Sequence, residues 1–203
     1  MGHKVGAESV RDVIRVSLEL GVEYLTLYAF STENWARPQE EVMGLMHLLK
    51  FLIRREVESL NREGVSIRAI GRIHRLPADV REELQRAMEK TRSNSRLYLY
   101  LALSYGGRAE IVDAVNRILS EGRDAIDEES FRNYLYAPEA PDPDLLIRTA
   151  GEKRISNFLL WQLAYTELYF TDVLWPDFRR DEYIKAIQDY SRRVRRFGGV
   201  VEE

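Results

Sequence analysis

Three apolar segments of the sequence are each followed directly by a cluster of polar residues. The clusters are STENWARP at 31–38, GGR at 106–108 and RTAGEKRISN at 148–157. Arginine suits phosphate because its planar guanidinium donates two hydrogen bonds in a fixed geometry. Paired glycines at a helix start leave backbone N–H groups accessible to a phosphate. The three clusters together predict a site for a phosphate or diphosphate.

The third cluster carries the strongest candidates, because Arg148, Arg154 and Ser156 can converge on one diphosphate. Each charge-assisted hydrogen bond to it is worth about 1.5–3 kcal/mol. Every cluster also has an ordinary interpretation: GGR is a common turn, Ser31 can cap a helix and Trp35 can be plain packing. Polar clusters after three separate predicted strands favour a site over coincidence, because loops after strands are where sites are built.

His3 stands just before a predicted helix, where the positive end of the helix dipole favours an anion or a proton relay. An exposed terminal histidine is the ordinary alternative. His47 and His74 have no spacing that indicates a metal site.

Alternating segments in the rest of the chain indicate how these clusters are positioned. Short runs rich in β-branched and aromatic residues predict strands, and longer amphipathic runs between them predict helices. The predicted strands are 22–30, 65–71, 97–105, 144–149 and 166–170, and the predicted helices are 8–21, 40–64, 78–92, 108–122, 127–135 and 181–198.

Strands that alternate with helices predict an α/β fold with a central parallel β-sheet flanked by helices. The 203 residues fit one domain over 1–203. Ligands of such sheets lie beyond the carboxyl ends of the strands, which is where the polar clusters fall.

The predicted helix at 40–64 carries apolar residues on more than one narrow stripe between positions 42 and 60. It is therefore either buried on two sides, or part of a dimer interface, or the wall of an apolar tunnel.

Composition excludes several classes of protein. A net charge of -3 argues against a general nucleic-acid binder, which needs excess basic charge. Without cysteine there is no disulfide framework, thiolate zinc site or cysteine nucleophile. No apolar run approaches the length of a membrane span, and the start lacks a signal-peptide core. We expect a soluble, cytoplasmic protein.

Several of these segments, in order and spacing, resemble the cis-prenyltransferase family, and most closely the bacterial undecaprenyl diphosphate synthases. The matching segments are FSTENWARP, SYGGRAEIVDA, DLLIRTAGEKRISNFLLWQLAYTELYF, LWPDF and RRFGG. The resemblance implies condensation of isopentenyl diphosphate with an allylic diphosphate, usually farnesyl diphosphate, to a long-chain polyprenyl diphosphate. It further implies Mg²⁺, a homodimer, an apolar tunnel and delivery of a cell wall precursor lipid at the inner membrane face.

The resemblance also implies a role for individual residues. Arg148, Arg154 and Ser156 would hold the diphosphate of isopentenyl diphosphate, and Glu167 would lie near the metal. Ser31 and Asn34 would assist proton removal, with His3 as a relay. Gly2, Trp35 and Arg37 would contribute to substrate binding. Gly198 and Gly199, after Arg195 and Arg196, match a tail that reaches toward the partner subunit. These residues are at the matching positions of this sequence.

One departure from the family is large. Members begin with a strand and an aspartate-bearing loop that positions Mg²⁺, and here the sequence starts immediately before the Gly2–His3 pair. We expect the first strand of the sheet to be missing, with lower stability as a result, and an impaired enzyme derived from an active synthase. The alternative is a non-catalytic scaffold subunit of a heteromeric enzyme, although the intact RTAGEKRISN segment counts against it.

Overall fold

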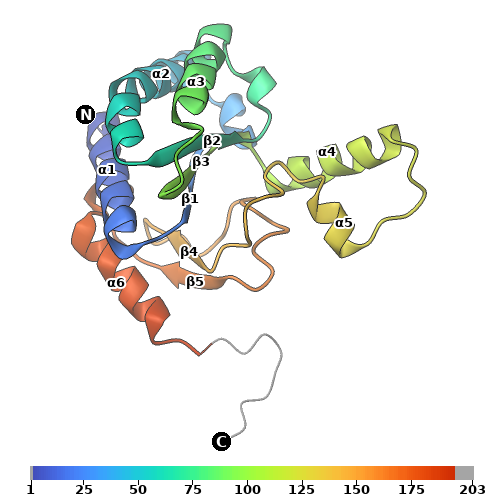
Figure 1. Ribbon diagram of the computed structural model, residues 1–203. Helices are drawn as coiled ribbons and strands as arrows, with labels where there is room; N and C mark the ends of the chain where they lie inside the picture. Colours follow the sequence, from blue (N-terminus) through green and yellow to red (C-terminus); the bar gives the residue numbers. More distant parts are fainter. Residues whose placement is uncertain (1, 195–203) are drawn as a thin grey trace, which may run out of the picture. The chain divides into compact units, whose positions relative to one another are not determined.

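The computed structural model describes residues 2–194 of the chain, and the side chains of residues 6–194 (Figure 1). Its helices are α1 (Gly2–Leu20), α2 (Gln39–Arg62), α3 (Ala78–Thr91), α4 (Gly107–Ser120), α5 (Glu128–Arg132) and α6 (Arg180–Ser191). Its strands are β1 (Tyr24–Ser31), β2 (Val65–Ile70), β3 (Leu97–Tyr105), β4 (Leu145–Arg148) and β5 (Glu167–Phe170). Short 3₁₀ turns at Thr32–Ala36, Ile73–Arg75 and Trp175–Asp177 complete the described elements.

The α/β prediction is confirmed, and every predicted strand and helix is present. The largest boundary differences are in α1, which begins at Gly2 rather than at residue 8, and in α6, which ends at Ser191 rather than at residue 198. His3 therefore lies in the first turn of a helix and not before it, contrary to the prediction. The segment before Glu8 is short and contains two glycines, so amphipathic periodicity is apparent only from Glu8 onward.

All strand pairs are parallel, as predicted, but the strands form two sheets instead of one central sheet. The described residues group into two compact units, one of residues 2–16, 142–156 and 162–194, the other of residues 17–141 and 157–161. We call them the β4–β5 unit and the β1–β3 unit. Alternation of elements predicts parallel strands but does not encode which strands pair.

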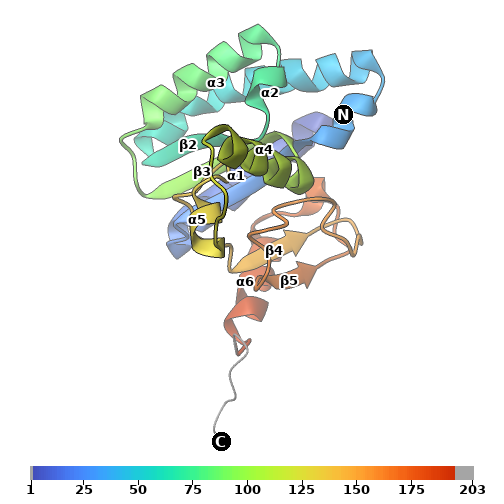
Figure 2. The same ribbon diagram turned by 90° about the vertical axis from the view of Figure 1, so that its right-hand side faces the viewer.

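In the β1–β3 unit the strand order is β1-β3-β2, so that β3 is central. Its sequence LYLYLALSY is almost wholly buried, as expected for the middle of a parallel sheet. Helices α2 and α3 cover one face of this sheet, and α4 and α5 project from its side (Figures 1 and 2).

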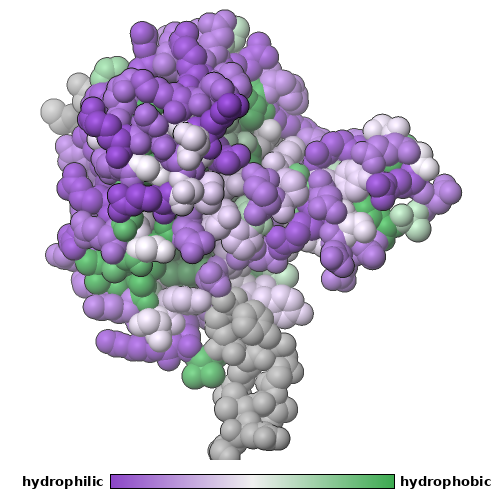
Figure 3. All heavy atoms as spheres, in the orientation of Figure 1, coloured by the Kyte–Doolittle hydropathy of each residue, from purple (hydrophilic) through white to green (hydrophobic). Residues whose placement is uncertain are grey.

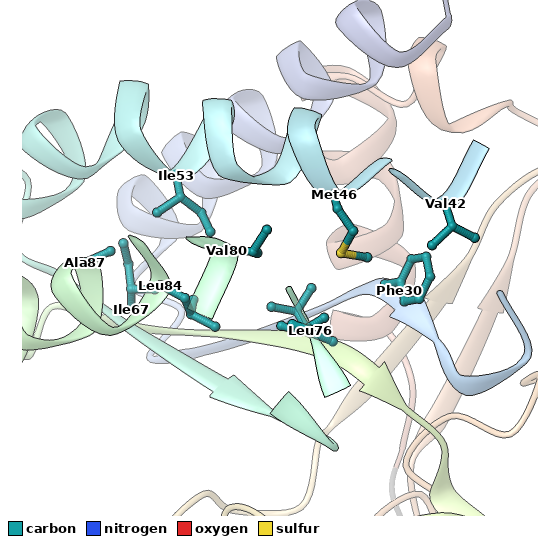
Figure 4. Packing of buried hydrophobic residues seen from close by; sticks show 10 residues of the cluster. Phe30, Val42, Met46, Ile53, Ile67, Leu76, Val80, Leu84 and Ala87 are labelled. Atoms are coloured by element: carbon teal, nitrogen blue, oxygen red, sulfur yellow. The ribbon is translucent and has the colours of Figure 1, made fainter. Parts of the chain in front are cut away.

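Apolar side chains from α2, α3 and the sheet pack between these layers. Figure 4 shows nine of them, namely Phe30, Val42, Met46, Ile53, Ile67, Leu76, Val80, Leu84 and Ala87. Burial of each large side chain contributes about 1.5–3 kcal/mol. Helix α2 packs on both α3 and β2 with Val42, Met46 and Ile53 buried, while its Met43 and Phe51 are exposed.

In the β4–β5 unit, α1 is tied to the segment that precedes α6. The indole of Trp175 donates to the carbonyl of Gly6 at 3.1 Å, and the hydroxyl of Ser9 donates to the carbonyl of Pro176 at 3.0 Å. Arg179 pairs with Asp12 at 2.5 Å and with Glu8 at 3.2 Å. These contacts join the start of the chain to residues more than 160 positions away.

Hydrophilic residues cover most of the surface in view, and a hydrophobic group lies on the projecting α4–α5 segment (Figure 3). Val112, Val115 and Leu119 of α4 are exposed and share one helix face. Among the described helices, none is long and apolar enough to span a bilayer.

Candidate functional site

The loop after β1 is held in shape by Ser31 and Asn34. Ser31 ends β1 and is the N-cap of the 3₁₀ turn Thr32–Ala36, and its backbone N–H donates to Oδ1 of Asn34 at 2.9 Å. The helix-cap interpretation of Ser31 is therefore correct, and the same bond fixes the orientation of the Asn34 carboxamide. Both side chains are half-buried at the carboxyl end of the strand.

Trp35 packs downward from this loop onto the sheet. Its ring meets Phe30 edge-on with centroids 5.0 Å apart, its Nε1 donates to Oγ of Ser104 at 2.9 Å, and the Arg75 guanidinium lies 5.3 Å from its centroid. Arg37 is exposed and pairs with Glu41 at 2.7 Å. Trp35 thus anchors the loop to the end of β3, whereas Arg37 lies where the loop is exposed to solvent.

Asn157 joins two of the three predicted polar clusters to its own. Its backbone carbonyl accepts from the N–H of Gly107 at 2.6 Å, and its Oδ1 accepts from the N–H of Arg108 at 2.9 Å. Its Nδ2 donates to the carboxylate of Glu33 at 2.9 Å. The loop after β1, the start of α4 and the 157 position are therefore connected through Asn157, the last residue of the third predicted cluster, to which the sequence analysis assigned no role of its own.

The prediction that the start of α4 leaves N–H groups for a phosphate is wrong for Gly107 and Arg108, because Asn157 takes both. The glycines are explained by close packing instead. A Cβ at Gly106 would lie 2.6 Å from Oγ1 of Thr32, and one at Gly107 would lie 2.6 Å from a side-chain carbon of Leu160. A hydrogen bond from a helix start to an asparagine 49 residues away is not a local pattern and cannot be predicted from the residues at the helix start.

Glu33 is ionised in this arrangement. Burial opposes its charge, but hydrogen bonds from Asn157, from its own backbone and from Ser31 and Thr32 outweigh burial and lower the pKa of the carboxyl below its usual value. A negative charge therefore stands at the carboxyl end of β1.

A buried polar network holds α4 against β3. The hydroxyl of Tyr105 donates to Glu110, which is 1 % exposed, and the other Glu110 oxygen accepts from the N–H of Tyr136 at 2.9 Å. The hydroxyl of Tyr136 donates to Asp113, which also accepts two bonds from Arg72 at 2.9 and 2.8 Å. Burial raises the pKa of Tyr105 and Tyr136, and the hydrogen bonds from Arg72 lower the pKa of Asp113.

The β4–β5 unit carries the predicted diphosphate residues. Arg148 is the last residue of β4, and its Nε is buried without a hydrogen-bond partner among the described residues. Arg154 is exposed and pairs with Glu152. An unpaired buried donor is costly, and Arg148 as a whole side chain is only half-buried at the carboxyl end of its strand.

The backbone of the 150–159 loop is tightly turned. Ala150, Ser156, Asn157 and Leu159 all have positive φ, between 42° and 66°. Such strain in residues other than glycine gathers at functional sites. At Ala150 φ is 66°, and glycine at this position would relieve the strain.

Glu167 begins β5, and its carboxylate pairs with Nη1 of Arg193 at 2.8 Å. In the parallel register Glu167 lies opposite Leu145, while Arg148 lies opposite Phe170, three positions along. Within residues 6–194, no group of three or more His, Asp or Glu side chains could hold a metal ion. Mg²⁺ is usually held by one or two carboxylates together with substrate phosphates, and Glu167 is the predicted carboxylate among the described side chains.

The remaining predicted residues have no described side chains. Gly2 and His3 are placed only as the first residues of α1. Arg195, Arg196, Gly198 and Gly199 lie outside the described residues.

Comparisons with known proteins agree on the family. The prenyltransferase family model described as undecaprenyl diphosphate synthase matches residues 1–198. An isoprenyl transferase of Heliobacterium mobile is 54% identical over 98% of this chain and 79% of its own length. That of Thermotoga maritima is 53% identical over 98% of this chain and 88% of its own length.

Solved structures agree as well. A probable undecaprenyl diphosphate synthase from Campylobacter jejuni superposes with a TM-score of 0.88 at 36% identity, over 96% of this chain and 92% of that one. Lavandulyl diphosphate synthase from Lavandula x intermedia, in complex with dimethylallyl diphosphate, superposes with a TM-score of 0.92 at 36% identity. That match covers 97% of this chain and 87% of the other. The chain therefore belongs to the undecaprenyl diphosphate synthase family of prenyltransferases.

Proposed function

We propose that this prenyltransferase condenses isopentenyl diphosphate with an allylic diphosphate, farnesyl diphosphate in the first instance, to give a long-chain polyprenyl diphosphate such as undecaprenyl diphosphate. The observation that carries the proposal is the place of Arg148, a half-buried arginine at the carboxyl end of the parallel strand β4. The reported relatives of this chain are isoprenyl transferases, and one solved structure similar to this chain is in complex with dimethylallyl diphosphate.

In this proposal Arg148 holds the diphosphate of isopentenyl diphosphate, with Arg154 and Ser156. Arg154 pairs with Glu152 at an exposed position. Because an exposed ion pair contributes little free energy, a diphosphate could replace that carboxylate at a small free-energy cost. The guanidinium groups would stabilise the diphosphate, where negative charge gathers.

Ser31 and Asn34 assist removal of the proton that the attacking unit loses when the new bond forms. The bond from the Ser31 N–H to Oδ1 of Asn34 would keep the carboxamide in one orientation for this step. His3 acts as the relay, and Gly2, Trp35 and Arg37 contribute to substrate binding. Trp35 does so by anchoring the loop, since its own indole bonds to Ser104.

Mg²⁺ is the proposed cation, and when bound it would stabilise charge on the diphosphate that leaves the allylic substrate. Glu167 is the proposed carboxylate near it. That carboxylate is paired with Arg193 in this structure, so it would have to exchange this partner for the ion.

The growing prenyl chain needs apolar surroundings, and we propose that it occupies the layer between α2, α3 and the sheet. Partly buried Leu45, Leu49 and Val57 line that cluster beside fully buried residues. Each buried methylene contributes about 0.8 kcal/mol, so a tunnel here would favour chain elongation.

We further propose a cytoplasmic homodimer that delivers its product at the inner membrane face and has no nucleic-acid partner. The exposed Val112, Val115 and Leu119 on one face of α4 support an interface between copies.

The test is to incubate the chain with farnesyl diphosphate, isopentenyl diphosphate and MgCl₂, and to follow diphosphate release and product length. Isopentenyl diphosphate binding is measured separately by calorimetry. Arg148→Met should weaken that binding about 10- to 100-fold, the equivalent of one charge-assisted bond. Arg117→Met, at an exposed arginine of α4, is the matched control and should bind as the wild type does.

Release of diphosphate together with a lengthened prenyl product would support the proposed condensation reaction. The second candidate function is a non-catalytic scaffold subunit, which would bind isopentenyl diphosphate without turning it over. Isopentenyl diphosphate binding without any turnover would indicate that scaffold or an impaired synthase. Equal binding by wild type and Arg148→Met would refute the assigned role of Arg148.

A further inference from the structure

Ser156 and Asn157 form a turn of two consecutive residues in the left-handed conformation. Their φ angles are 49° and 62°, and neither residue is glycine. Residues other than glycine lose free energy in this conformation, although asparagine loses less than most. Such strain persists only where the surrounding structure holds it in place. The contacts that hold this turn are therefore the contacts that fix the backbone of Ser156.

Asn157 makes three of these contacts, each through a different atom. Its carbonyl oxygen accepts from the N–H of Gly107 at 2.6 Å, and its Oδ1 accepts from the N–H of Arg108 at 2.9 Å. Its Nδ2 donates to the carboxylate of Glu33 at 2.9 Å. Because one main-chain and two side-chain atoms are held, both the position and the orientation of residue 157 are fixed.

The neighbours of Asn157 leave room for its side chain and favour its hydrogen bonds. A Cβ at Gly106 would lie 2.7 Å from Nδ2 of Asn157 and 2.6 Å from Oγ1 of Thr32, so only glycine leaves the carboxamide its space. The Glu33 carboxylate is ionised, and a hydrogen bond to an ionised acceptor is stronger than a neutral one. Asn157 is thus held between the loop after β1 and the start of α4.

Ser156 is the residue that this arrangement restrains, because it is joined to Asn157 by a peptide bond. The proposed function assigns Ser156, with Arg148 and Arg154, to the diphosphate of isopentenyl diphosphate. A group that is already ordered before binding loses less entropy when it binds, so a restrained backbone strengthens the contact that its side chain makes. Release of the restraint would therefore weaken diphosphate binding although no substrate contact is removed directly.

We propose that Asn157 is a positioning residue of the diphosphate site, which holds Ser156 in its left-handed backbone conformation. This role rests on the proposed function, from which the assignment of Ser156 is taken. The Oδ1 and Nδ2 atoms of Asn157 bond to Arg108 and Glu33, so the effect of Asn157 on the diphosphate passes through Ser156.

A double-mutant cycle tests this role, with isopentenyl diphosphate affinity of the full chain measured by calorimetry. Glycine adopts positive φ without strain, so Asn157→Gly removes the restraint and adds none. Ser156→Ala and Asn157→Gly should each weaken binding about 10-fold, because both remove the same hydroxyl contact. The double variant should also lose about 10-fold, whereas independent effects would multiply to about 100-fold.

Asn94→Ala is the matched control for lost stability. Nδ2 of Asn94 donates to Oδ1 of Asn61 at 2.9 Å and to the carbonyl of Val65 at 2.9 Å, at the amino end of β2. Its replacement should lower the Tm and leave isopentenyl diphosphate affinity at the wild-type value. Circular dichroism establishes that each variant is folded before its affinity is measured.

A pair of Glu33 variants extends the test in case Asn157→Gly does not fold. Glu33→Gln and Glu33→Leu both lack the charge, but only glutamine keeps an acceptor for Nδ2 of Asn157. Glu33→Leu should therefore bind isopentenyl diphosphate several-fold more weakly than Glu33→Gln does.

Four results would each overturn the positioning role. They are wild-type affinity in Asn157→Gly, multiplied effects in the double variant, an equal loss of affinity in Asn94→Ala, and equal affinities of the two Glu33 variants. With any of them, binding by the wild type and weaker binding by Arg148→Met would leave the proposed function standing. Absence of isopentenyl diphosphate binding by the wild type would instead overturn the proposed function, and the positioning role with it.

Discussion

Asn157 is the residue whose replacement we expect to disturb the strand-end structure most. Asn157→Ala removes the acceptor for the N–H of Arg108 and the donor to the carboxylate of Glu33, both at 2.9 Å. It retains the backbone bond from the N–H of Gly107. Residue 157 also has a φ of 62°, a left-handed conformation that asparagine tolerates and alanine does not.

The loss can be worked out from these contacts. A neutral hydrogen bond contributes about 0.5–1.5 kcal/mol and a bond to a charged group about 1.5–3 kcal/mol. Both bonds are at exposed positions, which favours the lower ends of these ranges. Left-handed strain adds about 1–2 kcal/mol for alanine. We expect Asn157→Ala to lower the free energy of unfolding by about 3 kcal/mol, a large part of the usual 5–15 kcal/mol.

Urea unfolding at pH 7 measures this loss of free energy. Two further variants separate the contribution of the side-chain hydrogen bonds from that of the backbone strain. Asn157→Gly lacks both side-chain bonds but relieves the strain, so it should be about 1–2 kcal/mol more stable than the alanine variant. Asn157→Asp keeps the acceptor for the N–H of Arg108 but sets a second carboxylate beside Glu33, and repulsion between the two raises the pKa of this carboxyl pair. The loss of unfolding free energy in Asn157→Asp should therefore shrink as pH falls through that raised pKa. A loss below about 1 kcal/mol for alanine, or equal losses for alanine and glycine, would refute the reasoning.

Two further predictions concern packing and charge near the start of α4. Gly107→Ala places a Cβ 2.6 Å from a side-chain carbon of Leu160 and should cost about 1–3 kcal/mol. Gly44→Ala, in α2 with no atom within 4 Å of the new Cβ, should instead stabilise by about 0.5–1 kcal/mol, and thermal unfolding that showed equal effects would contradict the packing argument. Asp113→Asn weakens two bonds from Arg72 and should cost about 1.5–3 kcal/mol at pH 7. Because the folded-state pKa of Asp113 is lowered, its contribution is present above its unfolded pKa near 4 and is lost as pH falls below it. Unfolding curves of Asp113→Asn and wild type should converge in acid, and a constant gap down to pH 2 would count against the charge pairing.

Local pattern determined the elements of this protein. The apolar run at 97–105 became β3 with the same boundaries, and the helix predicted at 78–92 is α3 at Ala78–Thr91. Each of these segments carries its period and its end signals within itself. The polar clusters after the strands, and the family to which the chain belongs, could likewise be read from the sequence because they depend on residue type and order.

Only the tertiary structure decided how those clusters are connected. Asn157 takes the N–H groups of Gly107 and Arg108, about fifty residues away, and so removes the anion site expected there. The indole of Trp35 donates to Ser104, a residue of another strand. The Oγ of Ser66 and the Nε of Arg68 are buried without a partner among the described residues, and the sequence of β2 does not predict this. A hydrogen bond between distant residues depends on which surfaces the packed elements bring together, and no local pattern of residues encodes that.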